Sequence, residues 1–254
     1  SMIKKVRPEK VILIDYPGFN LKMAEKISNL GIEVSYFILP QVWAWRSSRA
    51  KSLEKNTDKR ISIIPLEKDW FKKRDIKISY VGNPLIDLKK IKSDKSALHA
   101  RYNILPNDKI VVLMPGSRKS EIQKHWPIFL QTVGLMQKNS SYNIVPILLE
   151  APNVDIDNIP DHVITTKDSH HEILSIADAA IVCSGTATLE TAILGCPMVV
   201  CYQLSPITWF LAQRMSSVKY LSLVNLISKK DVVKELLQNN MSADNIMKEI
   251  IYLL

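Results

Sequence analysis

The stretch CSGTATLETAILGCPMVVCY at residues 183–202 decides the fold class. It predicts the end of a buried strand, a turn at Ser184, Gly185 and Thr186, a short helix and a second apolar strand. A helix that begins directly after a strand presents backbone N–H groups and the positive end of its dipole there. We therefore expect an anion such as a phosphate at this turn. The alternative is a helix that Ser184 and Thr186 simply cap.

The same order of strand and helix recurs along the chain. Short apolar runs that read as strands occur at 11–15, 32–39, 60–64, 78–82, 109–116, 142–149, 162–166, 179–183 and 197–202. Amphipathic segments lie between several of them, such as 19–31 and a basic helix from about Trp45. This alternation predicts an α/β protein with parallel sheets built from βαβ units. Many of the strands are apolar throughout, as expected where helices cover both faces of a sheet.

The sequence also predicts a division into domains. The stretch from about 83 to 108 is charged and interrupted by prolines, which is typical of a domain boundary. We expect a first domain at 1–90, a second at 104–228 and two C-terminal helices at 229–254, with Ser242 capping the last helix.

A second candidate for anion binding follows the strand at 109–116. Gly116, Ser117 and Arg118 stand where a helix begins, so backbone N–H groups and a guanidinium group could bind phosphate there. The P-loop pattern is absent, and an ordinary turn with a surface arginine is the alternative. In the 183–202 stretch, Glu190 lies one helical turn past Thr186 and could accept hydrogen bonds from a ribose diol. Two such turns in one domain favour a nucleotide diphosphate.

Two further sites are predicted in the first third of the chain. Asp15 ends an apolar strand and is well placed to act as a general base, although it could instead cap the next helix. Trp43, Trp45 and Arg46 combine indole rings with a cation, which suits a membrane interface or an acyl-chain groove. A core tryptophan beside a solvated basic helix is the alternative.

Composition limits the function classes. The 254 residues carry a formal net charge of +9, which fits nucleic acid, an anionic membrane surface or phosphorylated molecules as a partner. No nucleic-acid-binding motif accompanies the charge, so we expect no nucleic-acid partner. The three cysteines lack metal-site spacing, and the histidines form no ligand or triad pattern, so we expect no metal and no cofactor.

Taken together and in this order, these stretches resemble the lipid-A-disaccharide synthase family, glycosyltransferase family 19 of the GT-B fold. The resemblance covers nearly the whole chain. The matching motifs are IDYPGFNL (14–21), PQVWAWR (40–46), PLEKDWF (65–71), VGNPLID (81–87), LMPGSRKSEI (113–122), the 183–202 stretch, YLSLVNLI (220–227) and VKELLQ (233–238).

The resemblance implies a fold and a reaction. The fold would be GT-B, with two Rossmann-like domains containing parallel sheets. The reaction would transfer 2,3-diacylglucosamine from its UDP derivative to 2,3-diacylglucosamine 1-phosphate, with inversion, in lipid A biosynthesis. The products would be a tetraacyl disaccharide 1-phosphate and UDP. Such enzymes typically need no metal.

The resemblance also assigns roles to residues of this chain. Arg118 would meet the UDP diphosphate, with Gly116 and Ser117 in the same loop. Ser184, Gly185 and Thr186 would line the phosphates, Glu190 and Asn225 would hold the nucleotide or donor sugar, and Asp15 would be the base. Trp43, Trp45 and Arg46 would form the acceptor and membrane surface. The expected location is the cytoplasm, peripheral on the inner face of the bacterial inner membrane, and a homodimer is left open.

The chain departs from the family pattern at Val224, where the family usually has Pro, and at both ends. It lacks the opening glycine-rich loop of the type G-E-x-S-G-D, and it ends before the family's final helical segment. We therefore expect an incomplete N-terminal domain, truncation at both ends, and activity in the parent enzyme rather than in this polypeptide alone. The alternatives are another GT-B enzyme acting on UDP-sugars, such as a 2-epimerase or a peptidoglycan-precursor transferase, and a basic, non-catalytic binding module.

Overall fold

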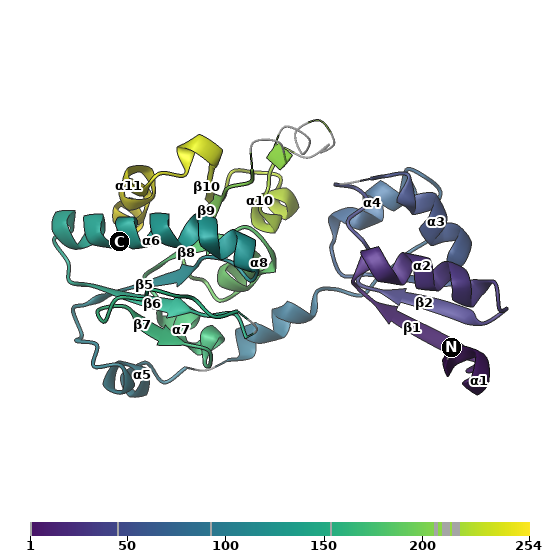
Figure 1. The fold of residues 1–254 in the computed structure, drawn as a ribbon, viewed down its shortest axis with the longest axis horizontal. Helices are drawn as coiled ribbons and strands as arrows, with labels where there is room; N and C mark the ends of the chain where they lie inside the picture. The colour runs from purple at the N-terminus through teal and green to yellow at the C-terminus, as the bar shows by residue number, and fades with distance from the viewer. Residues whose placement is uncertain are drawn as a thin grey trace. The chain divides into compact units, whose positions relative to one another are not determined.

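The computed structural model describes residues 2–44, 46–91, 93–152, 154–205, 208–209, 214 and 219–254. The chain divides into two compact units (Figure 1). One is built around residues Ser1–Pro84, and the other around Leu85–Pro206 and Lys219–Leu254.

In its described part, the first unit contains a four-stranded parallel sheet in the order β1-β2-β3-β4. Its strands are β1 (Lys10–Ile14), β2 (Glu33–Phe37), β3 (Lys59–Ser62) and β4 (Ser79–Tyr80). Its helices are α1 (Met2–Val6), α2 (Pro17–Ser28), α3 (Arg49–Asn56) and α4 (Leu66–Lys72). A core forms where α2, α3 and α4 pack on one face of this sheet. Its largest fully buried side chains are Ile27, Tyr36, Leu53 and Phe71.

The second unit contains a six-stranded parallel sheet in the order β10-β9-β8-β5-β6-β7. Its strands are β5 (Lys109–Met114), β6 (Ile144–Leu149), β7 (Ile164–Thr166), β8 (Ala179–Cys183), β9 (Met198–Tyr202) and β10 (Lys234–Leu237). Its helices are α5 (Lys95–Arg101), α6 (Lys119–Asn139), α7 (His170–Ile176), α8 (Thr186–Ile193), α10 (Leu223–Ser228) and α11 (Ala243–Leu253), with short 3-10 helices at Pro84–Lys90 and Gln238–Asn240.

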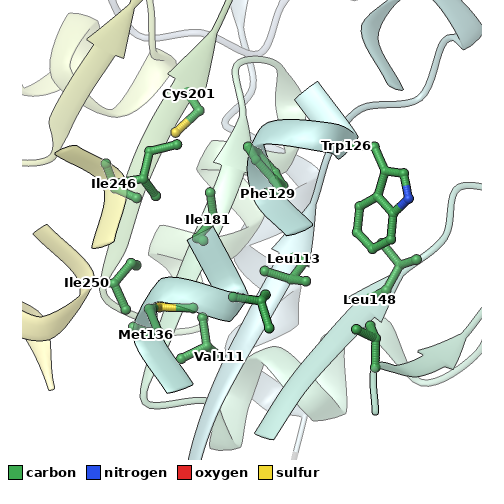
Figure 2. Close-up of a cluster of buried hydrophobic side chains, with 14 of the residues drawn as sticks. Val111, Leu113, Trp126, Phe129, Met136, Leu148, Ile181, Cys201, Ile246 and Ile250 are labelled. Carbon is green, nitrogen blue, oxygen red and sulfur yellow. The ribbon is translucent and has the colours of Figure 1, made fainter. Parts of the chain in front are cut away.

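Helices cover both faces of this sheet, because alternate residues of each strand point to opposite sides. Val111 and Leu113 of β5 pack against α6 and α11, in a core that also includes Phe129 and Ile250 (Figure 2). Residues of the opposite parity, such as Val112, pack against α7, α8 and α10 in a second core. The prediction of parallel sheets with helices on both faces is confirmed for this unit.

Several predicted boundaries differ from the structure. The residues VKELLQ, expected within a C-terminal helix, form β10 and a 3-10 turn, so 229–254 is a strand followed by one helix rather than two helices. The units separate between Pro84 and Leu85, and this last strand and helix belong to the second unit. The basic helix expected from about Trp45 begins at Arg49. Ser242 caps α11 as predicted, accepting a hydrogen bond from the Asn245 backbone N–H.

Across the residues that the structure describes, no helix is both long and apolar enough to cross a bilayer.

Candidate nucleotide site

The strand order of the second unit reverses between β5 and β8. From β5 the chain continues to β6 on one side, and from β8 it continues to β9 on the other. The two strands pair directly, with Met114 opposite Val182. Loops at the carboxyl ends of two such strands diverge and leave a crevice, which is where open α/β sheets bind their ligands. The two predicted anion-binding turns stand here. We call residues 115–118 the β5 turn and residues 184–186 the β8 turn.

Gly116 gives the β5 turn its shape. Its φ of +132° is a conformation that side chains rarely adopt. A Cβ atom at this position would lie 2.7 Å from the Cβ of Glu121 and 3.5 Å from the Sγ of Cys183. The β5 turn therefore passes close to α6 and to the end of β8, and any side chain at position 116 would collide with Glu121 of α6.

Glu121, in the first turn of α6, holds the β5 turn in place. Its carboxylate accepts hydrogen bonds from the Ser117 backbone N–H at 3.2 Å and from Nη1 of Arg118 at 2.7 Å. The Glu121 side chain is largely buried, whereas that of Arg118 is 74% exposed. The guanidinium group is therefore oriented by one partner and still open to a ligand.

His125 ties the β5 turn to the chain after β9. It is fully buried, and its Nε2 accepts a hydrogen bond from the Gln203 backbone N–H at 3.0 Å. Its Nδ1 lies 2.8 Å from the carbonyl oxygen of Pro115, so Nδ1 carries the proton and donates it. Burial lowers the pKa of His125, which keeps the ring neutral.

The β8 turn has no side-chain cap, which differs from the alternative interpretation of Ser184 and Thr186 as capping residues. Gly185 occupies the N-cap position of α8, and neither Ser184 nor Thr186 accepts a capping hydrogen bond. Ser184 instead donates from Oγ to the carbonyl oxygen of Leu221 at 3.4 Å. Gly185 and Thr186 are exposed. The start of α8 is thus left without a capping side chain of its own.

Glu190 lies one turn further along α8. Its Oε2 is 3.5 Å from Nε2 of His171 on α7, and its side chain is 25% exposed. It keeps acceptor capacity for a ligand at the same end of the sheet.

Asn225 does not have the predicted free amide. It is fully buried, and its Nδ2 donates to the Val233 carbonyl at 2.8 Å and to Glu235 at 2.9 Å. Its Oδ1 accepts from the backbone N–H groups of Val232 and Val233. All its hydrogen-bonding capacity is used within the protein, so the expected contact with a nucleotide or sugar is replaced by a structural role.

Asp15 lies at the end of β1 in the first unit, apart in sequence from the two turns. Asp15 and Tyr16 both have positive φ, 47° and 42°. The Asp15 carbonyl oxygen accepts hydrogen bonds from Nδ2 of Asn20 at 2.8 Å and from the Tyr36 hydroxyl at 2.7 Å. This strained conformation is therefore held by buried neighbours, and Asp15 itself is exposed.

Trp43 is not a surface residue, contrary to the expected role at a membrane. It is 4% exposed, and its Nε1 donates to Glu67 at 3.0 Å. Arg46 is exposed. Trp45 lies outside the described residues.

The structure thus brings together Gly116, Ser117 and Arg118 with Ser184, Gly185, Thr186 and Glu190 at one sheet edge. Sequence patterns gave no functional role to Glu121, His125 or Glu235, which hold these turns. Glu121 lay within a motif already recognised, PGSRKSEI, but nothing in the sequence links His125 to Gln203.

The sequence matches the family described as lipid-A-disaccharide synthetase over residues 1–254. It is 37% identical over 251 residues to the lipid-A-disaccharide synthase of Sulfurihydrogenibium sp., covering 90% of this chain and 64% of that protein. It is 35% identical over 258 residues to the enzyme of the same name from Coxiella burnetii, covering 99% of this chain and 68% of that protein. The chain therefore spans about two thirds of the length of these curated relatives.

Solved structures share the fold at low identity. A putative UDP-N-acetylglucosamine 2-epimerase from Listeria monocytogenes aligns with 99% of this chain and 66% of its own, with a TM-score of 0.69 and 11% identity. The glycotransferase of kitacinnamycin aligns with 99% of this chain and 68% of its own, with a TM-score of 0.61 and 13% identity. The fold is of the GT-B type, as predicted, and identities this low carry no information beyond fold.

Proposed function

The chain belongs to the lipid-A-disaccharide synthase family, and on that premise we propose that it provides the UDP-sugar-binding unit of an inverting glycosyltransferase. The donor is UDP-2,3-diacylglucosamine and the acceptor is 2,3-diacylglucosamine 1-phosphate. The products are the tetraacyl disaccharide 1-phosphate and UDP. Because the chain spans about two thirds of its curated relatives, the proposal concerns the reaction to which this polypeptide contributes.

The observation that carries the proposal is the adjacency of the β5 and β8 turns at the reversal point of the sheet. Departure of UDP places negative charge on the diphosphate. Arg118 and the backbone N–H groups of the two turns are the positive groups that we assign to it. Glu190 is assigned to the ribose hydroxyls.

The transfer itself is a single displacement. An acceptor hydroxyl oxygen attacks the anomeric carbon while the bond from that carbon to the diphosphate oxygen breaks. The electron pair leaves with UDP, and the hydroxyl proton passes to the carboxylate that we assign as the base, Asp15. Attack from the side opposite the leaving group inverts the anomeric carbon.

The site assignment is tested by titrating the wild type and Arg118→Ala with UDP in a calorimeter. A hydrogen bond to a charged group contributes about 1.5–3 kcal/mol. We therefore expect the variant to bind UDP roughly 10–100-fold more weakly. Arg101→Ala, which removes another exposed arginine from the same unit, is the matched control and should bind like the wild type.

Equal UDP affinity in the wild type and Arg118→Ala would contradict the site assignment. The epimerase alternative rests on fold similarity alone, and formation of a C2-epimerised UDP-sugar by the purified chain would favour it. A basic binding module would bind RNA or DNA in a salt-sensitive way without affinity for UDP.

The proposal also places the protein on the cytoplasmic face of the bacterial inner membrane, as a peripheral protein. Both substrates carry acyl chains, and the first unit is strongly basic. Residues 1–84 carry 17 lysines and arginines against nine aspartates and glutamates, a net charge of +8 out of +9 for the whole chain. Juxtaposed basic residues bind anionic lipid surfaces.

A further inference from the structure

The edge strand β10 and the turn after it carry two polar side chains that have no part in the function proposed above. These are Glu235, within the strand, and Gln238, directly after it. Because β10 pairs in parallel with β9, with Leu237 opposite Tyr202, Gln238 lies beside the chain that leaves β9. Both residues belong to the VKELLQ motif.

The Glu235 carboxylate receives four hydrogen bonds. Oε2 accepts from the Leu221 backbone N–H at 2.9 Å. Oε1 accepts from the Ser222 N–H at 3.0 Å, the Ser222 Oγ at 2.8 Å and the Asn225 Nδ2 at 2.9 Å. Ser222 and Asn225 are fully buried. One side chain therefore fixes the backbone of residues 221–222 and the buried amide of α10.

This anchoring continues to the β8 turn. The carbonyl oxygen of Leu221, whose N–H Glu235 holds, accepts the hydrogen bond from Oγ of Ser184. The Ser184 backbone N–H donates to the Cys201 carbonyl of β9 at 3.3 Å. The orientation of the Ser184 hydroxyl thus depends on the position at which Glu235 keeps Leu221.

Gln238 connects to the β5 turn by a separate route. Its Oε1 accepts from the Leu204 N–H at 2.7 Å, and its Nε2 donates to the Leu204 carbonyl at 3.3 Å. The preceding residue, Gln203, donates its N–H to His125, and the other ring nitrogen of His125 donates to Pro115. Gln238 and Pro115 are therefore linked through Leu204, Gln203 and His125.

We propose that Glu235 and Gln238 are positioning residues for the nucleotide site, Glu235 acting on the β8 turn through Leu221 and Gln238 acting on the β5 turn through His125. This inference rests on the proposed function. Neither side chain touches the nucleotide. Together they make the edge strand the common support of two turns that lie on different strands of the sheet.

The chemistry of the carboxylate makes Glu235 sensitive to a minimal change. All four of its partners present N–H or O–H groups to an acceptor. In Glu235→Gln, the new NH₂ group can only donate, so it faces at least one donor and leaves that group unpaired in a buried position. The segment around Leu221 must then shift. Gln238→Met keeps the size of the side chain and removes both hydrogen bonds to Leu204.

The experiment measures UDP affinity for the wild type, Glu235→Gln, Gln238→Met and the control Glu249→Gln. Glu249 is a carboxylate on α11, and its Oε1 lies 3.9 Å from Nζ of Lys234 in β10. We expect both positioning variants to bind UDP about tenfold more weakly, and the control to bind like the wild type. In a Ser184→Ala background the effect of Glu235→Gln should shrink, whereas that of Gln238→Met should persist.

Amide hydrogen exchange supplies a readout that does not depend on UDP. We expect faster exchange at Leu221 and Ser222 in Glu235→Gln, and at Gln203 and Leu204 in Gln238→Met, with exchange in β5 unchanged. Should Glu235→Gln fail to fold, Ser222→Ala removes one of the four contacts, the one from Oγ, and is measured in the same way.

Three results would overturn the inference. One is tight UDP binding by both positioning variants with intact folds. Another is unchanged exchange at residues 203–204 and 221–222. The third is a loss of UDP affinity on Glu235→Gln that is equally large in the wild-type and Ser184→Ala backgrounds. This would mean that the effect of Glu235 does not pass through the β8 turn. If the wild type itself does not bind UDP, the proposed function fails as well, and that outcome is recognised without any variant.

Discussion

Glu67 is a carboxyl group with almost no access to water. It is 1% exposed, and it accepts hydrogen bonds from the Trp43 indole and from the Ser62 hydroxyl. Burial raises its pKa to about 7, and the two hydrogen bonds oppose that rise only in part. Glu67 therefore supports the segment around Trp43 from inside the first unit.

This pKa gives the first unit a defined pH dependence. Because the folded state holds the proton up to about pH 7 and the unfolded state releases it near 4.5, stability is highest at low pH and falls as the pH rises. The gain expected at pH 5 and absent at pH 8 is roughly 2–3 kcal/mol. Glu67→Gln stays neutral, so its stability relative to the wild type should rise by that amount from pH 5 to pH 8.

The measurement is hydrogen exchange of the slowest amides of β2 at both pH values, because these report on the first unit. Glu54→Gln removes an exposed carboxylate from α3 and should show no such difference. A constant stability difference between Glu67→Gln and the wild type across this pH range would mean that Glu67 is ionised in the folded protein.

At the scale of elements, α6 connects the β5 turn to the chain after β9 through the imidazole ring of His125. His125 joins the β5 turn to the chain after β9, and its partners lie 10 and 78 residues away in the sequence. His125→Phe would leave the Pro115 carbonyl and the Gln203 N–H without partners in a buried place. An unsatisfied buried group costs about 1–3 kcal/mol, so we expect a loss of about 2–5 kcal/mol at pH 7.5.

The same substitution has a pH signature of opposite sign to that of Glu67. The lowered pKa means that the unfolded state takes up a proton below about pH 6.5 while the folded state does not, so wild-type stability falls as the pH falls. The cost of His125→Phe should therefore shrink by up to about 1.4 kcal/mol per pH unit between 6.5 and the folded pKa. Hydrogen exchange of the β5 amides measures this loss of stability, and His162→Gln, which changes an exposed histidine, is the control. A loss of stability that does not depend on pH would show that His125 takes up its proton equally in the folded and unfolded states.

The elements that sequence patterns predicted best are those buried on both faces. The strands at 109–114, 144–149, 179–183 and 198–202 stand out because their apolar runs are continuous. Residues 234–237 read as helix because Lys, Glu and Leu favour helices, and pairing with β9 overrides that preference at the sheet edge. The two turns were found because glycine, arginine and hydroxyl residues follow the strands directly. The sequence does not show that Asn225 and Trp43 are buried and hydrogen-bonded within the protein, because a residue type alone does not distinguish an internal partner from a ligand.

At the scale of the whole molecule, charge is divided unequally between the two units. Residues 1–84, the main part of the first unit, carry a net charge of +8, and the rest of the chain carries +1. In α3, Lys51 and Lys55 are both exposed and lie one helical turn apart, and α4 repeats this with Lys68 and Lys72. Pairs of like charge at this spacing repel one another, so they weaken an isolated helix by a few tenths of a kcal/mol. An anionic surface would relieve that repulsion.

We therefore expect the chain to bind vesicles that contain phosphatidylglycerol and not vesicles of phosphatidylcholine alone. The binding should weaken as the salt concentration increases from about 0.05 to about 0.5 M, a range over which the Debye length changes about threefold. Each basic residue near such a surface contributes about 1 kcal/mol. Lys51→Glu with Lys55→Glu should accordingly weaken binding at least tenfold in a sedimentation assay. Lys138→Glu with Lys230→Glu changes the net charge equally, but on the second unit, where both lysines are exposed. If the two double variants lose the same affinity for the vesicles, the attraction depends on the total charge of the chain and not on the first unit. If neither variant loses affinity, contacts with the acyl chains of the lipids, rather than these lysines, hold the protein at the membrane.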